Sequence, residues 1–471
     1  VLASFAERRT EIARQLQAAA AKEGLQPIDD DALLDEVTAL VEWPNVLTCR
    51  FDPEFLDVPQ ECLILTMKAN QKYFPLLDAA GKLTSKFLIV SNIKPDDPSA
   101  VIDGNERVVR PRLADAKFFF DQDRKKTLES RVAQLDKVVY HNKLGTQGER
   151  MQRVAALAAA IGKQLGGDAL AQQAQHAARL AKADLLTDMV GEFPELQGVM
   201  GRYYALHDGL PVAIADAIED HYKPKFAGDT LPRNPAGVCV ALADKLETLT
   251  GMFGIGQSPT GDKDPFALRR HALGVIRMLI EQDLPLELSW LFEAAQVHDE
   301  KVAAQLTEFI YERLAGSLRE QGYSALEVDA VVSLQPQRLG DIPKRLAAVR
   351  AFAALPEAAA LAAANKRIGN ILKKSSDAGG QINPALLREA AEKELYAAMQ
   401  NVVPRADAQF DAGDYTASLQ TLASLRAPVD AFFDGVMVNA EDAALRNNRL
   451  SLLAALHRAM NRVAQIERLA V

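Results

Sequence analysis

Cysteine is scarce in this chain of 471 residues. The three cysteines, Cys49, Cys62 and Cys239, lie far apart and form no CxxC pair. This spacing excludes a zinc ribbon and predicts a protein of a reducing, cytoplasmic compartment. The chain also lacks an apolar run of the roughly 18 residues that a membrane span needs. Its first residues show no secretion-signal pattern, so the sequence predicts neither a membrane partner nor export.

Complete catalytic motifs are lacking as well. The sequence contains no nucleophile elbow GxSxG, no HExxH and no dinucleotide-binding GxGxxG. Residues 251–270 come close to the phosphate-binding loop GxxxxGK[ST], but Asp262 stands where the lysine belongs and Lys263 comes one residue late. Because an acid would repel a phosphate there, a helix start with Asp264 as N-cap and Pro265 at its first position is the better interpretation.

What the sequence does contain is an ordinary globular composition, with 48% hydrophobic and 25% charged residues. Apolar periodicity predicts helices over residues 1–23 and 29–41. Short runs rich in β-branched and aromatic residues then predict strands, with DAAGK (78–82) as a hairpin loop between two of them. These runs are VLTCRF, ECLILTMK, YFPLLD and KFLIVSN.

From about residue 146 to the end, alanine-rich amphipathic segments alternate with Gly, Pro and Asn breaks and predict helices. The predicted fold class is therefore mainly α with a small N-terminal α+β domain. The length suggests several domains. We expect them at residues 1–145, 146–282, 283–340 and 341–471.

A possible metal site involves His176 and Asp184. If residues 176–188 form one helix, these two side chains point about 80° apart. Further ligands would have to come from His221 and Asp244, and together the four would suit a metal-dependent phosphohydrolase. Lys182 stands where another histidine ligand would help most, and its ammonium would repel a cation. Surface charges on a structural helix are the alternative interpretation.

The clearest binding pattern lies in residues 355–375. The apolar residues form one stripe at helical spacing: Leu361, Ala364, Ile368, Ile371 and Leu372. A polar face beside it carries Lys366, Arg367, Asn370, Lys373 and Lys374. No acid interrupts the run from Asn365 to Ser376, so this face suits contacts to phosphates. The helix dipole also favours lysines near a helix C-terminus, which leaves a purely structural interpretation open.

Residues 432–471 carry a second cluster of cations and amides. Asn439 and Asp442 have the spacing of a capping box at the start of a long helix. The helix stripe consists of Leu453, Leu456, Met460, Val463 and Ile466. Its first part carries Arg446, Asn447, Asn448 and Arg449. Cations at this end oppose the helix dipole, whereas Arg and Asn side chains can contact bases or phosphates.

Long blocks spread over essentially the whole chain resemble the beta subunit of the bacterial two-chain glycyl-tRNA synthetase. The blocks include VEWPNVLTCRFDPEFLDVPQE, MKANQKYFPLLDAAGKLTSKFLIVSN, GNERVVRPRLADAKFFFDQD, KADLLTDMVGEFPELQGVMGRYYA, ADKLETLTGMFGIGQSPTGDKDPFALRR and FFDGVMVNAEDAALRNNRLSLL. The family has a further N-terminal region and this chain begins without Met, so we expect it to be part of a longer protein.

The resemblance implies an α2β2 enzyme that joins glycine to its tRNA with ATP. It implies that the alpha subunit binds ATP, Mg²⁺ and glycine, and that this chain binds no cofactor itself. The implied partners are the alpha subunit, tRNA(Gly) and a second beta subunit. HIGH, KMSKS and GxGxGxxR runs, which mark the catalytic folds of such enzymes, are absent from this sequence.

The resemblance also gives the domains an expected identity. Residues 146–282 would form an HD-like helical domain with incomplete metal ligands at His176, Asp184, His221 and Asp244. Residues 283–340 would be a helical linker, and 341–471 a helical-bundle anticodon-binding domain similar to that of arginyl-tRNA synthetase.

The resulting hypothesis is a tRNA-binding subunit whose two basic groups share one face of the helical bundle. The expected tRNA contacts are Lys366, Arg367, Asn370, Lys373, Lys374, Arg446, Asn447 and Arg449. An HD-type phosphohydrolase and a structural scaffold for a partner chain are the rival hypotheses.

Overall fold

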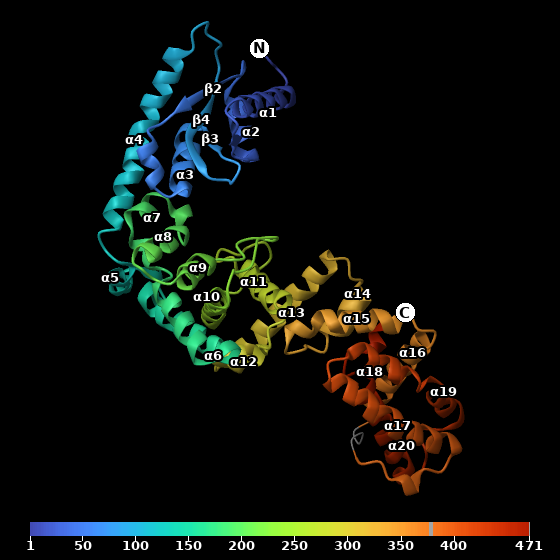
Figure 1. Ribbon diagram of the computed structural model, residues 1–471. Coiled ribbons are helices and arrows are strands. Elements are labelled where there is room, and N and C mark those ends of the chain that lie inside the picture. The colour runs from blue at the N-terminus through green and yellow to red at the C-terminus, as the bar shows by residue number, and fades with distance from the viewer. Residues whose placement is uncertain (376–379, 471) are drawn as a thin grey trace. The chain divides into compact units, whose positions relative to one another are not determined.

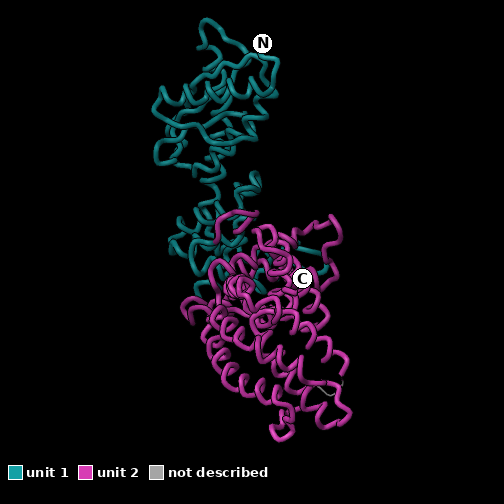
Figure 2. The backbone as a smooth tube through the Cα atoms, turned by 90° about the vertical axis from the view of Figure 1, so that its right-hand side faces the viewer, with its two compact units in different colours: residues 1–155, 172–222, 232–240 teal, residues 156–171, 223–231, 241–471 magenta. Residues whose placement is uncertain are grey.

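The computed structural model describes residues 1–375 and 380–470, and most of these residues lie in helices (Figure 1). The chain divides into two compact units (Figure 2). Unit 1 comprises Val1–Ala155, Gln172–Tyr222 and Pro232–Val240. Unit 2 comprises Ala156–Ala171, Lys223–Leu231 and Ala241–Val471. The predicted fold class, mainly α with a small N-terminal sheet region, is confirmed.

Unit 1 contains an antiparallel sheet with the strand order β1-β3-β4-β2. Its strands are β1 (Gln26–Pro27), β2 (Asn45–Arg50), β3 (Phe74–Leu77) and β4 (Leu83–Ser91). Helices α1 (Phe5–Lys22) and α2 (Asp31–Leu40) bury Ile12, Leu16 and Val37 in one cluster with Phe74 and Leu88 of the sheet. Burial of these apolar side chains joins the two helices to the strands.

Local sequence signals account for several of these elements. The side chain of Asp30 accepts a hydrogen bond from the backbone N–H of Leu33 and so caps α2. Between β3 and β4 the N–H of Asp78 donates to the carbonyl of Lys82 at 2.9 Å, and Gly81 adopts a positive φ of 75°. The predicted hairpin loop is therefore confirmed.

One predicted strand is wrong. The run ECLILTMK lies within helix α3, Gln60–Gln71, rather than in the sheet. Its buried residues are Cys62, Leu63, Thr66 and Met67, which recur with helical rather than alternating spacing. A short continuous apolar run suits a buried strand and a buried helix equally well, so the run alone did not separate the two.

The remaining elements of unit 1 are mostly helices. They are α4 (Ser99–Asp123), α5 (Leu128–Val132), α7 (Asp188–Glu192), α8 (Val199–His207), α9 (Val212–Asp220) and a two-stranded ladder of β5 (Val139–His141) and β6 (Gly145–Thr146). Helices α6 (Gln147–Leu180) and α10 (Pro235–Gly254) contribute residues to both units. Helix α6 begins at a capping box of Thr146 and Glu149, and it is interrupted at Gly167, where φ is 77°.

The described residues in the longer segment of unit 2 are mostly helical. Its helices are α11 (Leu268–Glu281), α12 (Leu288–Ala294), α13 (Glu300–Glu320), α14 (Ala325–Val332), α15 (Ile342–Ala353), α16 (Ala358–Lys373), α17 (Ala390–Asp411), α18 (Tyr415–Ala423), α19 (Arg426–Gly435) and α20 (Ala443–Met460). The helix predicted to begin at Pro265 begins at Leu268 instead. The carboxylate of Asp264 nevertheless accepts hydrogen bonds from the N–H groups of Leu268 and Arg269, at 2.8 and 3.0 Å.

Helices α16 to α20 enclose a core of their own within unit 2. Leu361 and Ile368 of α16 are buried in it, and Ala364, Ile371 and Leu372 pack against it, so the predicted apolar stripe is confirmed. The second stripe is also buried, but α20 ends at Met460. Val463 and Ile466 therefore come from the turn and the short 3-10 helix that follow.

No single helix among the described residues is long and apolar enough to cross a membrane. The segments 339–353 and 358–373 reach that length and composition only as a pair, which is bent by 110°.

Candidate nucleic-acid interface

Helix α16 separates its two faces as the sequence predicts. Leu361 and Ile368 lie 1% and 0% exposed in the core, whereas all five polar residues of the opposite face are exposed. These residues are Lys366, Arg367, Asn370, Lys373 and Lys374. The helix satisfies its own backbone hydrogen bonds, and its apolar side anchors it, so the cations stand on a fixed support.

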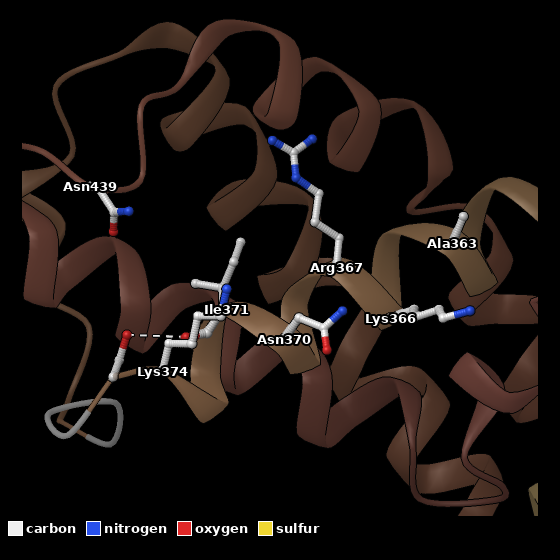
Figure 3. A pocket seen from close by; sticks show the side chains of 8 residues that line it. Ala363, Lys366, Arg367, Asn370, Ile371, Lys374 and Asn439 are labelled. Atoms are coloured by element: carbon white, nitrogen blue, oxygen red, sulfur yellow. Dashed lines mark hydrogen bonds between the residues drawn. The ribbon is translucent and has the colours of Figure 1, made fainter.

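A hollow of about 530 Å³ lies along this face of α16 (Figure 3). Four of the five predicted residues line it, and Lys373 does not. The lining consists of Ala363, Lys366, Arg367, Asn370, Ile371, Lys374, Ser375 and Asn439. No acidic side chain is among these residues, so the hollow has the charge expected of a phosphate-contacting surface.

Asn439 enters the hollow from a different segment, the loop 436–442 between α19 and α20 (Figure 3). The spacing of Asn439 to Asp442 predicted a capping box instead, and that prediction is wrong. Asp442 caps α20, because its carboxylate accepts hydrogen bonds from the N–H groups of Ala444 and Leu445. The side chain of Asn439 is thereby left on an exposed loop.

Arg449 was expected to contact tRNA, and its burial corrects this expectation. Arg449 is only 5% exposed, and its guanidinium forms an ion pair with Glu392, whose exposure is 0%. It also donates to the carbonyl of Met437 at 2.7 Å. A side chain that is desolvated and already paired in this way has no donor to offer a nucleic acid at the surface.

The neighbouring residues of α20 divide between the surface and the interior. Arg446 is half-buried and donates to the carbonyl of Ala440 at 2.9 Å, and Asn447 is exposed. Asn448 is buried, and its amide both accepts from and donates to the backbone of Asn383, at 2.7 and 3.1 Å. None of these α20 residues lines the hollow, so the two predicted groups do not meet there. Arg446 and Arg449 instead donate hydrogen bonds to the backbone of the loop that carries Asn439.

The candidate metal ligands have a different arrangement from the expected one. Helix α6 ends at Leu180, a 3-10 helix covers Ala183–Leu186, and α7 begins at Asp188, so the assumption of one helix through residues 176–188 is wrong. Thr187 produces this interruption in part, because its side chain caps α7 by accepting from the N–H of Val190.

Asp184 is completely buried and binds backbone rather than solvent. Its Oδ2 accepts hydrogen bonds from the N–H groups of Gly198 and Gly201, at 2.6 and 3.0 Å. These donors lie at the start of α8, where N–H groups have no partner within the helix. Burial raises the pKa of Asp184 to about 6, and the two N–H groups and Lys182 oppose the rise.

The other three candidate ligands come from different elements. His176 is half-buried in α6, and Asp244 is buried in α10. His221 is buried beyond the end of α9, and its Nδ1–H donates to the carbonyl of Ile218. Across residues 1–375 and 380–470, no three His, Cys, Asp or Glu side chains are grouped so that they could hold a metal ion. The residues present therefore do not fit the metal centre of an HD phosphohydrolase.

Lys182, which stands where a metal ligand would help most, makes a structural contact with an aromatic ring instead. Its Nζ lies 3.9 Å from the centroid of the Tyr222 ring, a distance typical of a cation–π interaction. Tyr222 in turn packs on His221, with ring centroids 3.9 Å apart.

Comparison with known proteins agrees with the resemblance found in the sequence. A family model described as glycyl-tRNA synthetase beta subunit matches residues 1–333, and one described as a DALR anticodon binding domain matches residues 361–466. The glycine–tRNA ligase beta subunit of Polaromonas naphthalenivorans is 75% identical over 476 residues, covering 100% of this chain and 67% of the relative. That of Dechloromonas aromatica is 74% identical over 482 residues, covering 100% and 68%.

The match to the DALR model covers the α16 hollow, since all residues that line the hollow fall between 361 and 466. Together with the helical fold and the whole-length similarity, it establishes that this chain belongs to the glycyl-tRNA synthetase beta-subunit family, a family of ligase subunits, and that it carries a DALR anticodon-binding domain.

Proposed function

We propose that the exposed face of α16 binds the anticodon arm of tRNA(Gly). Lys366, Arg367, Lys373 and Lys374 contact phosphates, and Asn370 contacts the same arm between them. The observation that carries this proposal is the cationic face of α16, exposed and free of acidic residues, within a domain of the anticodon-binding type. Phosphate contacts of this kind fix the position of an RNA and supply most of its salt-dependent affinity.

The chain acts as the tRNA-handling subunit of an α2β2 enzyme in the cytoplasm. ATP, Mg²⁺ and glycine bind to the alpha subunit, and this chain binds no cofactor. Its partners are the alpha subunit, tRNA(Gly) and a second beta subunit. The names of its relatives, each a glycine–tRNA ligase beta subunit, support this assignment.

A salt titration of tRNA binding tests the proposal. Each phosphate contact that is lost should reduce the slope of log affinity against log salt by roughly 0.7 to 0.9, in addition to weakening the binding itself. The test variant replaces four cations of α16 by alanine: Lys366, Arg367, Lys373 and Lys374. A control variant with the same charge change replaces four exposed lysines of unit 1: Lys22, Lys82, Lys94 and Lys137.

The α16 variant should lose both affinity and salt slope, whereas the control should keep most of both. Unchanged affinity of the α16 variant for tRNA would overturn the proposal. If the unaltered chain itself failed to bind tRNA in a filter assay, a scaffold role for the alpha subunit would replace it.

A further inference from the structure

Helix α4 exposes a basic stretch of its surface along one side of unit 1 (Figure 1). Its inner side buries Val109 and Leu113 where the helix packs on α3, α7 and β2. Its outer side carries three exposed arginines, Arg107, Arg110 and Arg112. No acidic residue lies between the first and the last of them. In a chain of net charge −9, this run is a local basic surface of the kind that contacts nucleic acid.

The three arginines differ from the others of unit 1 because they have no partner. Across residues 1–375 and 380–470, none of their side chains forms a hydrogen bond or an ion pair. Apart from Arg50, every other arginine of unit 1 contacts a carboxylate, a backbone carbonyl or an aromatic ring. Glu106, the nearest acid in the sequence, accepts from the backbone N–H of Arg50 at 2.7 Å instead of pairing with them. Their charge is therefore available to a ligand.

The arginines surround a ridge of low side chains that ends at an aromatic ring. At 100° per residue, Pro111, Ala114 and Phe118 lie along one exposed line of the helix. Arg110 and Arg112 lie on opposite sides of this line. Because Pro111 and Ala114 have short side chains, a ligand can approach the helix between the arginines. Phe118 is 57% exposed, so its ring offers a face on which a base can stack.

Pro111 also gives the ridge an open hydrogen-bond acceptor. In an α-helix the N–H of residue 111 would donate to the carbonyl of Arg107, and proline has no N–H. Proline inside a helix weakens it more than any other residue, and Pro111 is exposed, so core packing does not account for its presence. The carbonyl of Arg107 can accept a hydrogen bond from a ligand, and the 2′-hydroxyl of RNA is such a donor.

We infer that the outer face of α4 binds a single-stranded segment of RNA, at a site separate from α16. The three arginines contact phosphates, which their planar forks bind in bidentate fashion. One base stacks on Phe118, and the carbonyl of Arg107 accepts from a 2′-hydroxyl. The helix rises roughly 16 Å between these two residues, which gives room for more than one nucleotide. All of these groups belong to unit 1, so the inference does not depend on the proposed function of α16.

Binding of short labelled oligonucleotides, followed by fluorescence anisotropy, tests the inference. Every chain carries the four alanine substitutions of α16, so that α16 does not contribute. One RNA has the sequence of the 3′ end of tRNA(Gly) and another that of one of its loops. Binding of either supports the inference, and the tighter of the two identifies the source of the single strand.

Replacing the three arginines of α4 by alanine should weaken binding of the RNA. It should also reduce the slope of log affinity against log salt by roughly 2, at about 0.7 for each phosphate of a single strand. The control replaces three exposed arginines of unit 1 that already have partners, Arg14, Arg153 and Arg179, by alanine. This control has the same charge change and should keep both affinity and slope.

Two substitutions separate the ridge from the charges around it. Phe118→Ala should weaken RNA binding by about 5- to 150-fold without changing the salt slope, because the ring contacts a base. Phe226→Ala, which removes a 62% exposed ring of unit 2, is its control. Pro111→Ala restores the N–H that pairs with the carbonyl of Arg107. It should abolish a preference of about 2- to 13-fold for RNA over DNA of the same sequence.

Three results would overturn the inference, and none of them touches the proposed function of α16. The first is that neither RNA binds, or that both bind equally well to the arginine variant and its control. The second is an equal loss of binding in the two variants, because binding would then follow net charge alone. The third is displacement of RNA by polyglutamate as effective as by unlabelled RNA, which would identify an acidic protein segment as the ligand. If circular dichroism showed that the arginine variant unfolds, Phe118→Ala would decide.

Discussion

Replacing Asp184 by asparagine should remove a pH dependence of stability that the buried carboxylate creates. The pKa of Asp184 is raised from 3.8 to about 6, chiefly because burial disfavours the charged form. A rise of the pKa from 3.8 to about 6 corresponds to roughly 3 kcal/mol, since each tenfold change in proton affinity is worth about 1.4 kcal/mol. Because the carboxyl is completely buried, solvent screening does not reduce this figure appreciably.

The sign follows from proton binding. Between pH 3.8 and about 6 the folded chain holds a proton on Asp184 that the unfolded chain has lost. The free energy of unfolding should therefore fall by about 3 kcal/mol as pH rises through this window, and stay level above it. Asparagine cannot ionise, and its Oδ1 can still accept from the N–H groups of Gly198 and Gly201. Asp184→Asn should consequently match the unaltered protein near pH 4 and exceed its stability near pH 7.

Urea unfolding in a Trp290→Phe background, where the tryptophan fluorescence comes from Trp43 of unit 1, measures this difference at each pH. Asp188→Asn, an exposed carboxylate four residues away, serves as the control. A stability difference between Asp184→Asn and the unaltered chain that does not vary from pH 4 to 7 would refute the reasoning. Zinc or manganese that stabilised the unaltered chain but not Asp184→Asn would restore the metal-site interpretation.

Two further substitutions test packing around the same elements. Arg449→Met should destabilise the DALR domain by about 3–5 kcal/mol because it leaves Glu392 buried and unpaired, and Glu392→Leu in the same chain should recover much of this loss. Urea unfolding followed by circular dichroism or by hydrogen exchange of α20 measures it. Gly201→Ala should cost about 1–3 kcal/mol, because its new Cβ would lie 2.7 Å from Cγ2 of Ile218, and thermal unfolding of unit 1 measures the cost.

The sequence predicts best where local signals and burial agree. The stripe of Leu361 and Ile368 is both periodic and adjacent to a continuous polar face, and α16 has that orientation. The hairpin at 78–82 has its own turn residues and forms as predicted. The run at 61–68 fails because its apolar residues are continuous, so periodicity does not separate a helix from a strand.

The site residues show a second limit. Arg446 and Arg449 have the same local pattern as the cations of α16, and nothing in the sequence states that Glu392, 57 residues away, will pair with Arg449 in the interior. Asn439 was missed because its spacing to Asp442 suits a capping box. The N-cap of α20 is Asp442, three residues after the predicted cap, Asn439. Which residue takes this position depends on where α19 ends.

Asp184 and Arg449 illustrate one physical reason why charged residues in suggestive patterns turn out to be structural. Each lies beside irregular backbone whose polar groups lack partners within a helix or sheet, the start of α8 for Asp184 and the loop 436–442 for Arg449. Buried backbone groups must be satisfied, and a neighbouring charged side chain does this strongly. The cations of α16 do not satisfy irregular backbone in this way, because a regular helix carries them. Their charge is therefore available to an RNA.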